Sequence, residues 1–501
     1  VVISAAAHCN DITKVVEPVL QKSGMNKIYY INLSNDGYKL GGSSFAQTQN
    51  KIGSATPTIK DAAKFKNAFN TIQRLIKEDK ILAGHDISAG GMLTTLLELC
   101  FSQENLGLNI NISNLGENDA VKLLFAENSG IIFQSISEDI PTILAKNNVE
   151  FFELGNAVRS ETVKITNNGE VLEFNIPELR DVWFETSYLL DDKQTANGLA
   201  KDRFDNYKNQ PLKFNFPKHF TGKIENVIAN ETEQSVSNNE ITSSQTSRYD
   251  GKKPKAAIIR EKGSNSEREM ANAMYLAGFD VKDVHMTDLI SGRENLEDIQ
   301  FIGAVGGFSN SDVLGSAKGW AGAFLFNEKA KTALDNFFKR EDTLSVGICN
   351  GCQLFMELEV INPEHEVHGK MLHNDSHKHE SGFTSVTIQE NNSVMLSSLA
   401  GSTLGVWISH GEGKFNLPME ENAYNIVAKY GYNAYPANPN GSDYNTAMMS
   451  SKDGRHLVMM PHIERSIFQW NWANYPVGRK DEVSPWAEAF MNARKWIETK
   501  K

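Results

Sequence analysis

The sequence is poor in cysteine, in basic charge and in long apolar runs. Its 501 residues include only four cysteines, Cys9, Cys100, Cys349 and Cys352. That is too few for a disulfide framework, so we expect a reducing compartment, the cytoplasm. The formal net charge of −12 argues against a nucleic-acid surface. Apolar runs such as Ala256–Ile259 are far shorter than the roughly 20 residues of a membrane span. We therefore expect no nucleic-acid or membrane partner.

The start of the chain also lacks familiar features. It begins with Val1 rather than methionine, and no basic segment of a secretory signal precedes its first apolar residues. The opening residues have the pattern of a strand already under way. We therefore expect a fragment of a longer protein.

Apolar spacing divides the chain into three regions. Residues 1–175 alternate strand-like runs with helical periodicity, which predicts an α/β or α+β domain. Residues 176–250 form a connecting segment, and its part 230–250 has the polar composition of a linker. Residues 251–501 alternate strands and helices again.

Several elements are predicted with definite bounds. The helices are Asp61–Lys77, Ile87–Phe101, Glu178–Leu190, Ser266–Ala277 and Ser484–Glu498. The strands are Lys27–Leu33, Lys80–Ala83, Gly130–Ser135, Lys255–Ile259, Phe301–Val305, Thr343–Gly347, Val406–Ser409 and Leu457–Met460. A hairpin turn is expected at Asn167–Gly169, and a capping box at Ser266 and Glu269.

The most informative motif surrounds Cys349. An apolar strand runs into this cysteine, glycines stand two residues before and two after it, and a helix follows. This is the pattern of a nucleophile elbow, in which a strained turn presents the side chain and the helix start favours the thiolate. The backbone N–H of Asn350 would face a developing oxyanion. Cys349 and Cys352 also form a C-x-x-C pair, so a redox or metal-binding protein is the alternative.

A second motif supplies a base and its partner. His462 follows the apolar run Leu457–Met460, and Glu464 comes two residues later. The imidazole could take the thiol proton while the carboxylate fixes the ring tautomer. Taken alone, such a pair is more often a surface histidine beside a helix-initiating glutamate. Because the elbow lies upstream in the order Cys, His, Glu, the catalytic interpretation is favoured here. A third piece is Gly303–Ser309, where a strand ends in two glycines that could offer N–H groups to a ligand.

These motifs resemble known families. The segments GICNGCQ at 347–353, GGFSNSDVLG at 306–315 and PHIER at 461–465 are similar to class I, triad-type glutamine amidotransferases. REKGSNSEREM at 260–270, DVHMTDL at 283–289 and SHGEG at 409–413 resemble the glutaminase domain of the large, single-chain phosphoribosylformylglycinamidine synthases. LGGSSFAQ at 40–47 and HDISAGGM at 85–92 resemble the second half of the synthetase in that family.

The resemblance implies a fold and an activity. The fold would be an AIR-synthetase-like domain followed by a flavodoxin-like amidotransferase with an open, mostly parallel sheet and helices on both faces. Cys349 would be the nucleophile, His462 the base and Glu464 the orienting acid, with Gly307, Phe308 and Asn350 at the oxyanion and glutamine. The ammonia would serve ATP-dependent amidation of formylglycinamide ribonucleotide in purine biosynthesis. The partner would be the missing first half of the synthetase, and the full-length enzyme would be a monomer.

The synthetase part offers candidates for a nucleotide. Asp86 is expected to bind Mg²⁺ that accompanies ATP or ADP, because hard cations favour carboxylate oxygens. Gly41, Gly42 and Ser43 could present N–H and hydroxyl groups to a phosphate. The structural alternatives are a helix cap for Asp86 and an ordinary turn for the glycines. The resembled family usually has an acidic residue at the position of Ala89, so whatever that acid does in the family has no counterpart at this position.

Two further alternatives concern metal and function. The histidines between 365 and 379 are close enough in sequence for zinc, but no helix or strand period brings three together, so we interpret them as surface residues. The glutaminase could instead serve another synthetase, such as one for GMP or CTP. It could also be a catalytically silent binding subunit.

Overall fold

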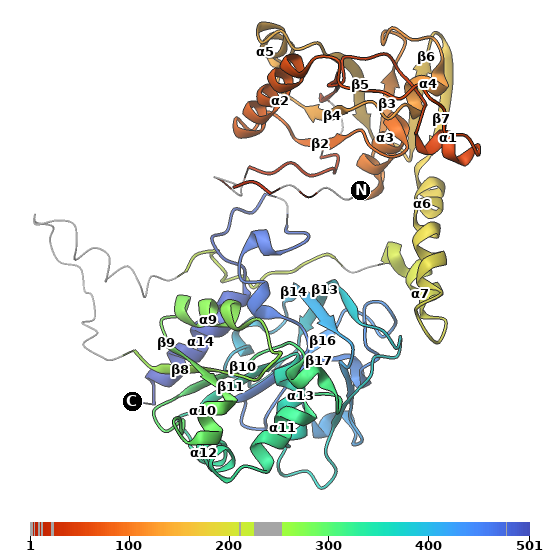
Figure 1. Ribbon diagram of the computed structural model, residues 1–501. Coiled ribbons are helices and arrows are strands. Elements are labelled where there is room, and N and C mark those ends of the chain that lie inside the picture. Colours follow the sequence, from red (N-terminus) through yellow and green to blue (C-terminus); the bar gives the residue numbers. More distant parts are fainter. Residues whose placement is uncertain are drawn as a thin grey trace, which may run out of the picture. The chain divides into compact units, whose positions relative to one another are not determined.

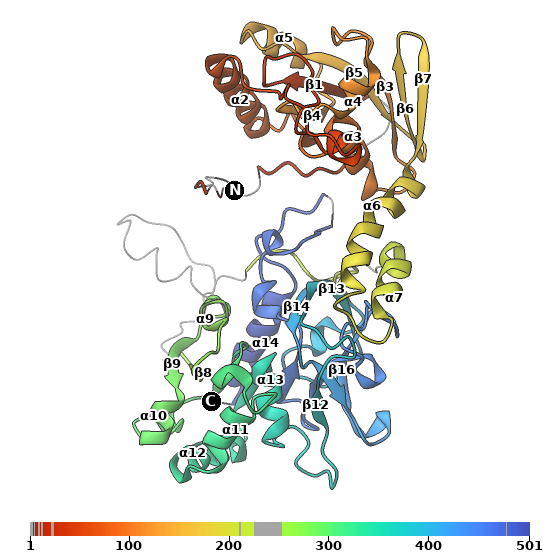
Figure 2. The ribbon, with the colours of Figure 1, turned by 45° about the vertical axis from the view of Figure 1, so that its right-hand side comes forward.

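The computed structural model describes residues 25–209, 212–224, 253–476 and 478–500, together with residues 4, 6–8, 11 and 14–21. The chain divides into two compact units, Val1–Ser187 and Tyr188–Lys501. Figures 1 and 2 show both units from two sides. The predicted linker 230–250 lies outside the described residues. None of the described helices is both long enough and apolar enough to cross a membrane.

The first unit is a sheet with helices on both faces (Figure 1). Its strand order is β2-β4-β1-β5-β3-β6-β7, and of its neighbouring pairs only β3 and β6 run parallel in the described residues. The strands are β1 Lys27–Asn32, β2 Ala83–Asp86, β3 Gly107–Asn111, β4 Gly130–Ser135, β5 Phe152–Val158, β6 Thr162–Asn167 and β7 Glu170–Asn175. The helices are α1 Ser44–Thr48, α2 Ala62–Lys77, α3 Gly91–Phe101, α4 Ala120–Phe125, α5 Ile140–Lys146 and α6 Ile176–Asp191, which ends in the second unit.

Alternation along β1 explains the two layers of helices. Ile28 and Tyr30 pack into one core with α3 and α4, whereas Tyr29 and Ile31 pack into the other with α2 and α5. Successive side chains of a strand point to opposite faces, so a strand that is apolar throughout must be covered on both sides.

The second unit has a nine-stranded sheet in the order β14-β13-β16-β17-β18-β11-β10-β8-β9. Neighbours from β18 to β9 are parallel, and those from β14 to β18 are antiparallel. The expected parallel sheet therefore forms one part, and an antiparallel extension forms the rest. The strands are β8 Lys255–Arg260, β9 Asp280–His285, β10 Phe301–Ala304, β11 Leu344–Ile348, β13 Glu380–Ile388, β14 Thr403–His410, β16 Asn425–Tyr430, β17 Thr446–Ser450 and β18 His456–Met459, with β12 Lys370–Leu372 and β15 Lys414–Asn416 as a separate pair.

Helices cover both faces of this sheet. In both views α9 and α14 lie together, while α11 and α13 lie across the strands from them (Figures 1 and 2). The helices are α7 Leu199–Asn206, α9 Glu267–Leu276, α10 Met286–Ser291, α11 Lys318–Leu325, α12 Glu328–Lys339, α13 Asn350–Glu357 and α14 Trp486–Glu498.

Most predicted elements are confirmed within a few residues. The hairpin at Asn167–Gly169 joins β6 to β7, with positive φ at Asn168 (47°) and Gly169 (91°) as a tight turn requires. The predicted strand Lys80–Ala83 begins only at Ala83. The capping box at Ser266 is wrong: Ser266 has a φ of 67° and no side-chain cap bond, and the Glu269 carboxylate lies 3.7 Å from Nε of Arg465.

Candidate active site

Cys349 joins β11 to α13 in a backbone conformation that few residues adopt. Its φ is 55° and its ψ is −108°, which is strained for any residue with a Cβ. The flanking glycines make the turn possible. A Cβ at Gly347 would stand 2.5 Å from the Gly351 carbonyl oxygen, and one at Gly351 would stand 2.0 Å from the Ala304 carbonyl oxygen. The predicted strand–turn–helix is therefore present, with Cys349 at its tip.

His462 and Glu464 form a buried pair just after β18. His462 Nδ1 lies 2.6 Å from Glu464 Oε1, and the two residues are 1% and 3% exposed. The backbone N–H of His462 donates to the Trp407 carbonyl oxygen at 2.8 Å, which fixes the main chain here. Burial alone would lower the pKa of His462, but the Glu464 carboxylate and the nearby Cys349 raise it to about 10. The ring is therefore protonated at neutral pH.

Gly306 lies against both Cys349 and His462, and because it has no side chain these two residues can approach each other. A Cβ there would stand 2.9 Å from Cε1 of His462 and 3.4 Å from Cβ of Cys349. The Cys349 thiol donates to the Ser409 carbonyl oxygen at 3.4 Å. Cys349 is near enough to raise the pKa of His462, yet Nε2 has no hydrogen-bond partner in the described part of the chain. The thiol therefore lies beside the imidazole without a fully formed hydrogen bond to it, and Nε2 has no competing partner among the described residues.

In the glycine turn after β10, the two predicted oxyanion donors are the backbone N–H groups of Gly307 and Phe308, and only one of them is available. Residues 263–265 and 306–308 form an antiparallel bridge, in which the Phe308 N–H donates to the Gly263 carbonyl oxygen at 3.0 Å. Phe308 therefore has no free N–H for an oxyanion. Gly307, with a φ of 112°, stands between the bonds of this bridge, and a Cβ on it would lie 2.6 Å from the Asn265 nitrogen. Its N–H is left available, as is that of Asn350 in the first turn of α13.

One cavity of about 580 Å³ lies at the centre of this site. Cys349, His462 and Gly307 lie on its wall with Gln353, whose amide donates to the Glu412 carbonyl oxygen at 2.7 Å. The cavity also contains residues that sequence reasoning did not select as site residues: Asn265, Asp312, His373, His377, Lys378, His379, Ser409, His410, Gly411, Glu412 and Arg465. The resemblance at SHGEG was the signal that could have found part of this set.

His410 is the most unusual of these additional residues. It is 2% exposed, and neither ring nitrogen has a hydrogen-bond partner among the residues described. Burial, with the neighbouring His462 and His379, lowers its pKa to about 3. His410 is therefore a neutral imidazole with free polar atoms beside the proposed nucleophile.

The redox and metal alternatives find no support in this geometry. Cys352 is fully buried in α13, and burial, with the neighbouring Cys349, raises the pKa of its thiol well above the ordinary value. Cys349 and Cys352 are not bonded to each other. Across the described ranges, no three His, Cys, Asp or Glu side chains form a metal-ligand group. His373, His377 and His379 are exposed, as predicted, and all three also line the cavity.

The predicted phosphate turn in the first unit is filled by the chain itself. The N–H groups of Gly41, Gly42 and Ser43 donate to the carbonyl oxygens of Ala55 (2.8 Å), Ile52 (2.6 Å) and Leu40 (3.2 Å). The Ser43 hydroxyl caps α1, accepting from the Ala46 N–H at 3.2 Å. Glu127 Oε1 accepts two further N–H groups: that of Ser44, directly after the turn, at 2.7 Å, and that of Gly90, before α3, at 2.9 Å. This turn therefore has no backbone donors left for a phosphate.

Asp86 does not cap a helix, since α3 begins at Gly91 with Gly90 as its N-cap. Its carboxylate is 72% exposed and lies 3.3 Å from Nδ1 of His85, whose Nε2 lies 3.0 Å from Glu98. Asp86 could supply one oxygen to Mg²⁺, but the described residues around it do not complete a ligand set.

Comparison with known proteins agrees with both units. Residues 26–167 match the C-terminal domain of the AIR synthase related proteins, and residues 253–497 match the CobB/CobQ-like glutamine amidotransferase domain. The chain is 37% identical to a probable chloroplastic/mitochondrial phosphoribosylformylglycinamidine synthase of Arabidopsis thaliana and 36% identical to the phosphoribosylformylglycinamidine synthase of Homo sapiens, each over 99% of its length. It spans 36% and 38% of those two proteins.

Among solved structures, PurLQS from Thermotoga maritima is similar with a TM-score of 0.38 and 23% identity, over 49% of this chain and 99% of that one. One segment of the chain is thus similar to AIR-synthase-related proteins and another to glutamine amidotransferases, and nearly the whole chain is similar to part of the phosphoribosylformylglycinamidine synthases.

Proposed function

We propose that this chain hydrolyses glutamine at Cys349 and supplies the ammonia for ATP-dependent conversion of formylglycinamide ribonucleotide to its amidine. The observation that carries the proposal is the position of the strained Cys349 turn beside the buried His462–Glu464 pair. Gly306 lies against both Cys349 and His462 and leaves room for them because it has no side chain. A cysteine and an imidazole that line one cavity, with a buried carboxylate bonded to the imidazole, are the parts that nucleophilic amide cleavage requires.

The first half-reaction begins with the proton on His462. The Cys349 thiolate attacks the carboxamide carbon of glutamine, a C–S bond forms, and the carbonyl electrons move to oxygen. The N–H groups of Gly307 and Asn350 would stabilise that oxyanion. His462 then gives its proton to the leaving nitrogen, the C–N bond breaks, and ammonia departs from a glutamyl thioester.

The second half-reaction restores the enzyme. Neutral His462 takes a proton from water, and the resulting hydroxide attacks the thioester carbon. The C–S bond breaks, glutamate leaves, and the thiolate is regenerated beside protonated His462. Glu464 keeps the ring in one orientation throughout, because its carboxylate holds Nδ1.

The ammonia would be consumed in the synthetase. There ATP would transfer a phosphoryl group to the formamide oxygen, and ammonia would displace phosphate to give the amidine. The match of residues 26–167 to AIR-synthase-related proteins favours this acceptor over a GMP or CTP synthetase. Because the curated relatives are more than twice as long, we propose that amidine synthesis needs sequence beyond these residues. The cytoplasmic location stays a prediction.

A diazoketone analogue of glutamine tests the proposal. We expect it to alkylate the full chain once, and peptide mapping to place the adduct on Cys349. Glutamate release should be slow or undetectable for the chain alone and rise when the remaining synthetase sequence is added. An adduct on Cys352, or no adduct under conditions that label a known glutaminase, would contradict the hydrolase assignment. Amidine synthesis by these 501 residues alone would contradict the need for further sequence.

A further inference from the structure

The glutaminase unit includes residues that precede the matched amidotransferase domain. That domain begins at residue 253, whereas the compact unit begins at Tyr188. The end of α6, the turn after it and α7 lie in between, and their side chains reach the segment 374–380. Because His377, Lys378 and His379 line the cavity of Cys349, we name this segment the cavity wall.

Asp191, the last residue of α6, binds the cavity wall directly. Its carboxylate pairs with Lys378 of the wall and with Arg203 of α7, the latter at 2.8 Å, and accepts a hydrogen bond from Thr195 at 2.7 Å. The Asp191 side chain is only 12% exposed. Burial would raise its pKa, but the Lys378, Thr195 and Arg203 contacts lower it overall. Asp191 is therefore a shielded, charged anchor.

Arg203 extends the anchor to the other end of the wall. Its guanidinium pairs with Glu380 at 2.6 Å and lies 4.8 Å from the centre of the Tyr435 ring. The Tyr435 hydroxyl donates to the second oxygen of Glu380 at 3.0 Å. Asp191 of α6 thus holds Lys378, and Arg203 of α7 holds Glu380. These two wall residues are the neighbours of His379 in the sequence. His379 itself meets the Ser409 hydroxyl at 3.0 Å inside the cavity.

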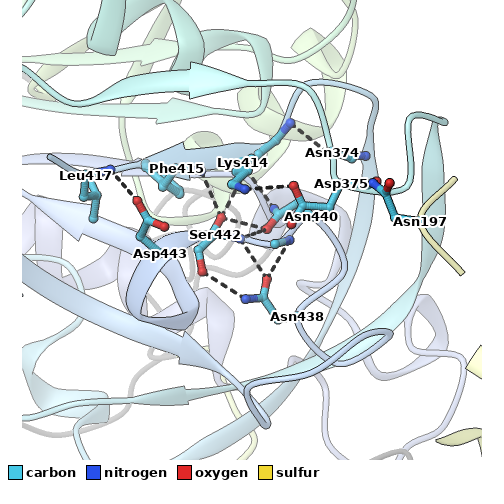
Figure 3. A network of polar contacts seen from close by, with 12 residues as sticks. Asn197, Asn374, Asp375, Lys414, Phe415, Leu417, Asn438, Asn440, Ser442 and Asp443 are labelled. Atoms are coloured by element: carbon cyan, nitrogen blue, oxygen red, sulfur yellow. Dashed lines mark hydrogen bonds and ion pairs between the residues drawn. The ribbon is translucent and has the colours of Figure 1, made fainter. Parts of the chain in front are cut away.

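Neutral contacts join the same two parts of the chain. The Ala196 N–H donates to the Ser376 carbonyl oxygen at 3.0 Å, and the Asn197 amide donates to the Asp375 carbonyl oxygen at 2.8 Å. Figure 3 shows Asn197 beside Asp375, whose carboxylate pairs with Lys414 at 2.8 Å.

From the wall, the contacts continue to the strand end that holds His410. The Asn374 amide donates to the His410 carbonyl oxygen at 2.7 Å, and its oxygen accepts the Gly413 N–H at 2.9 Å. The Asn440 amide, labelled in Figure 3, donates to the Gly413 carbonyl oxygen at 2.8 Å. The position of the 409–413 segment therefore depends on the wall, and the wall depends on α6 and α7.

We propose that Asp191 is a positioning residue of the glutaminase, which holds the cavity wall through Lys378 and Arg203 in the form that binds glutamine. This inference rests on the proposed glutaminase function. It means that glutamine affinity is set partly by a residue outside the amidotransferase domain, on a helix that begins in the first unit at Ile176. Asp191 does not touch the reacting atoms, so it should affect binding more than the chemical step.

The test uses the full chain and the diazoketone analogue of glutamine. The rate of Cys349 alkylation is measured against analogue concentration, which separates the half-saturating concentration from the maximal rate. For Asp191→Asn we expect the half-saturating concentration to rise about tenfold, since a shielded charged contact contributes roughly that factor. The maximal rate should change less than about threefold, because Cys349, His462 and Glu464 are untouched. Asp191→Glu, which keeps the charge, should recover most of the affinity.

Asp205→Asn is the matched control. Asp205 is also on α7 and pairs with Lys201, but both side chains are 54% exposed and neither reaches the wall. It should behave as the unmodified chain. If Asp191→Asn does not fold, Arg203→Gln breaks the same network from α7 and carries the same expectation.

The inference is overturned if the half-saturating analogue concentration of Asp191→Asn or Arg203→Gln equals that of the Asp205→Asn control. It is also overturned if these variants lower only the maximal rate of Cys349 alkylation. Absence of Cys349 labelling in the unmodified chain would instead contradict the proposed function.

Discussion

The turn at Gly41–Ser43 and the turn at Cys349 are both built on glycine, but they differ in how many polar groups are left without partners. In the first turn every N–H donates to a carbonyl oxygen of the same unit, and Glu127 takes the next two donors. Around Cys349, the described residues leave His462 Nε2 and both nitrogens of His410 without hydrogen-bond partners.

The difference separates a structural turn from the one at the proposed nucleophile. Buried polar groups without partners cost free energy, so several of them beside Cys349 favour a ligand site there. The glycines of the first turn serve the backbone: Gly42 has a φ of 76°. Gly306 instead leaves room for two reacting side chains. The following experiments test this contrast, from the largest expected effect to the smallest.

Replacing the nucleophile should have the largest effect. Cys349→Ala should lower glutamate release by at least about 10³-fold, because no other group can form the thioester. Cys352→Ser is the matched control and should retain activity within about threefold, since its thiol is buried and protonated. Both are measured by glutamate release and by alkylation. Activity that depended on Cys352 instead would revive the redox interpretation.

Removing the Glu464 charge should come next. Glu464→Gln should lower glutamate release by roughly 10²- to 10⁴-fold, because the ring loses its orientation and its proton. The pKa of His462 is raised to about 10 in the folded chain and lies near 6.5 when unfolded. The pair therefore stabilises the fold fully below pH 6.5, and this contribution is lost as the pH rises to 10. Denaturant unfolding should show a large difference between the unmodified chain and the variant at pH 6.5 and a small one at pH 10.

Adding one methyl group should distinguish Gly306, which lies beside Cys349 and His462, from the turn at Gly41–Ser43. Gly306→Ala should lower the maximal alkylation rate by about tenfold or more, because its Cβ would stand 2.9 Å from His462. Gly42→Ala places its Cβ 3.6 Å from the nearest atom, of Thr56, so it should cost about 1–2 kcal/mol of backbone strain only. Equal alkylation rates for the two variants would remove the distinction.

The buried His410 should make the second unit sensitive to acid. Its pKa is lowered to about 3 in the folded chain, so the unfolded chain binds a proton that the folded chain does not. Stability from this group should fall by about 2 kcal/mol between pH 7 and pH 5. His410→Phe, which keeps a flat ring, should lose that part of the pH dependence in chemical unfolding. An unchanged pH profile would show that His410 has partners in solution.

The smallest effect is expected at Ser43. Ser43→Ala removes the cap of α1 and should cost about 1 kcal/mol in the unfolding of the first unit. Alkylation of Cys349 should be unchanged. A large loss of nucleotide binding without loss of stability would show that Ser43 contacts a phosphate after all.

Part of this molecule could be predicted from local sequence. The elbow at Cys349 and the pair His462–Glu464 were found because glycine spacing and short motifs determine their own turns. Local rules failed at Ser266, where a capping box matched the sequence but Glu269 lies near Arg465 instead. They also failed at Gly41–Ser43, because the groups that occupy those donors come from Ala55, Ile52 and Leu40.

By itself, the sequence determined which residues can do chemistry and the turn that presents Cys349, since both depend on residue type and spacing over a few positions. Only the tertiary structure decided which polar groups are left without hydrogen-bond partners and which residues hold the cavity wall in place. Asp191 and Lys378 are 187 positions apart. The physical reason is that hydrogen bonds and ion pairs depend on distance in space, and spacing along the chain does not fix that distance.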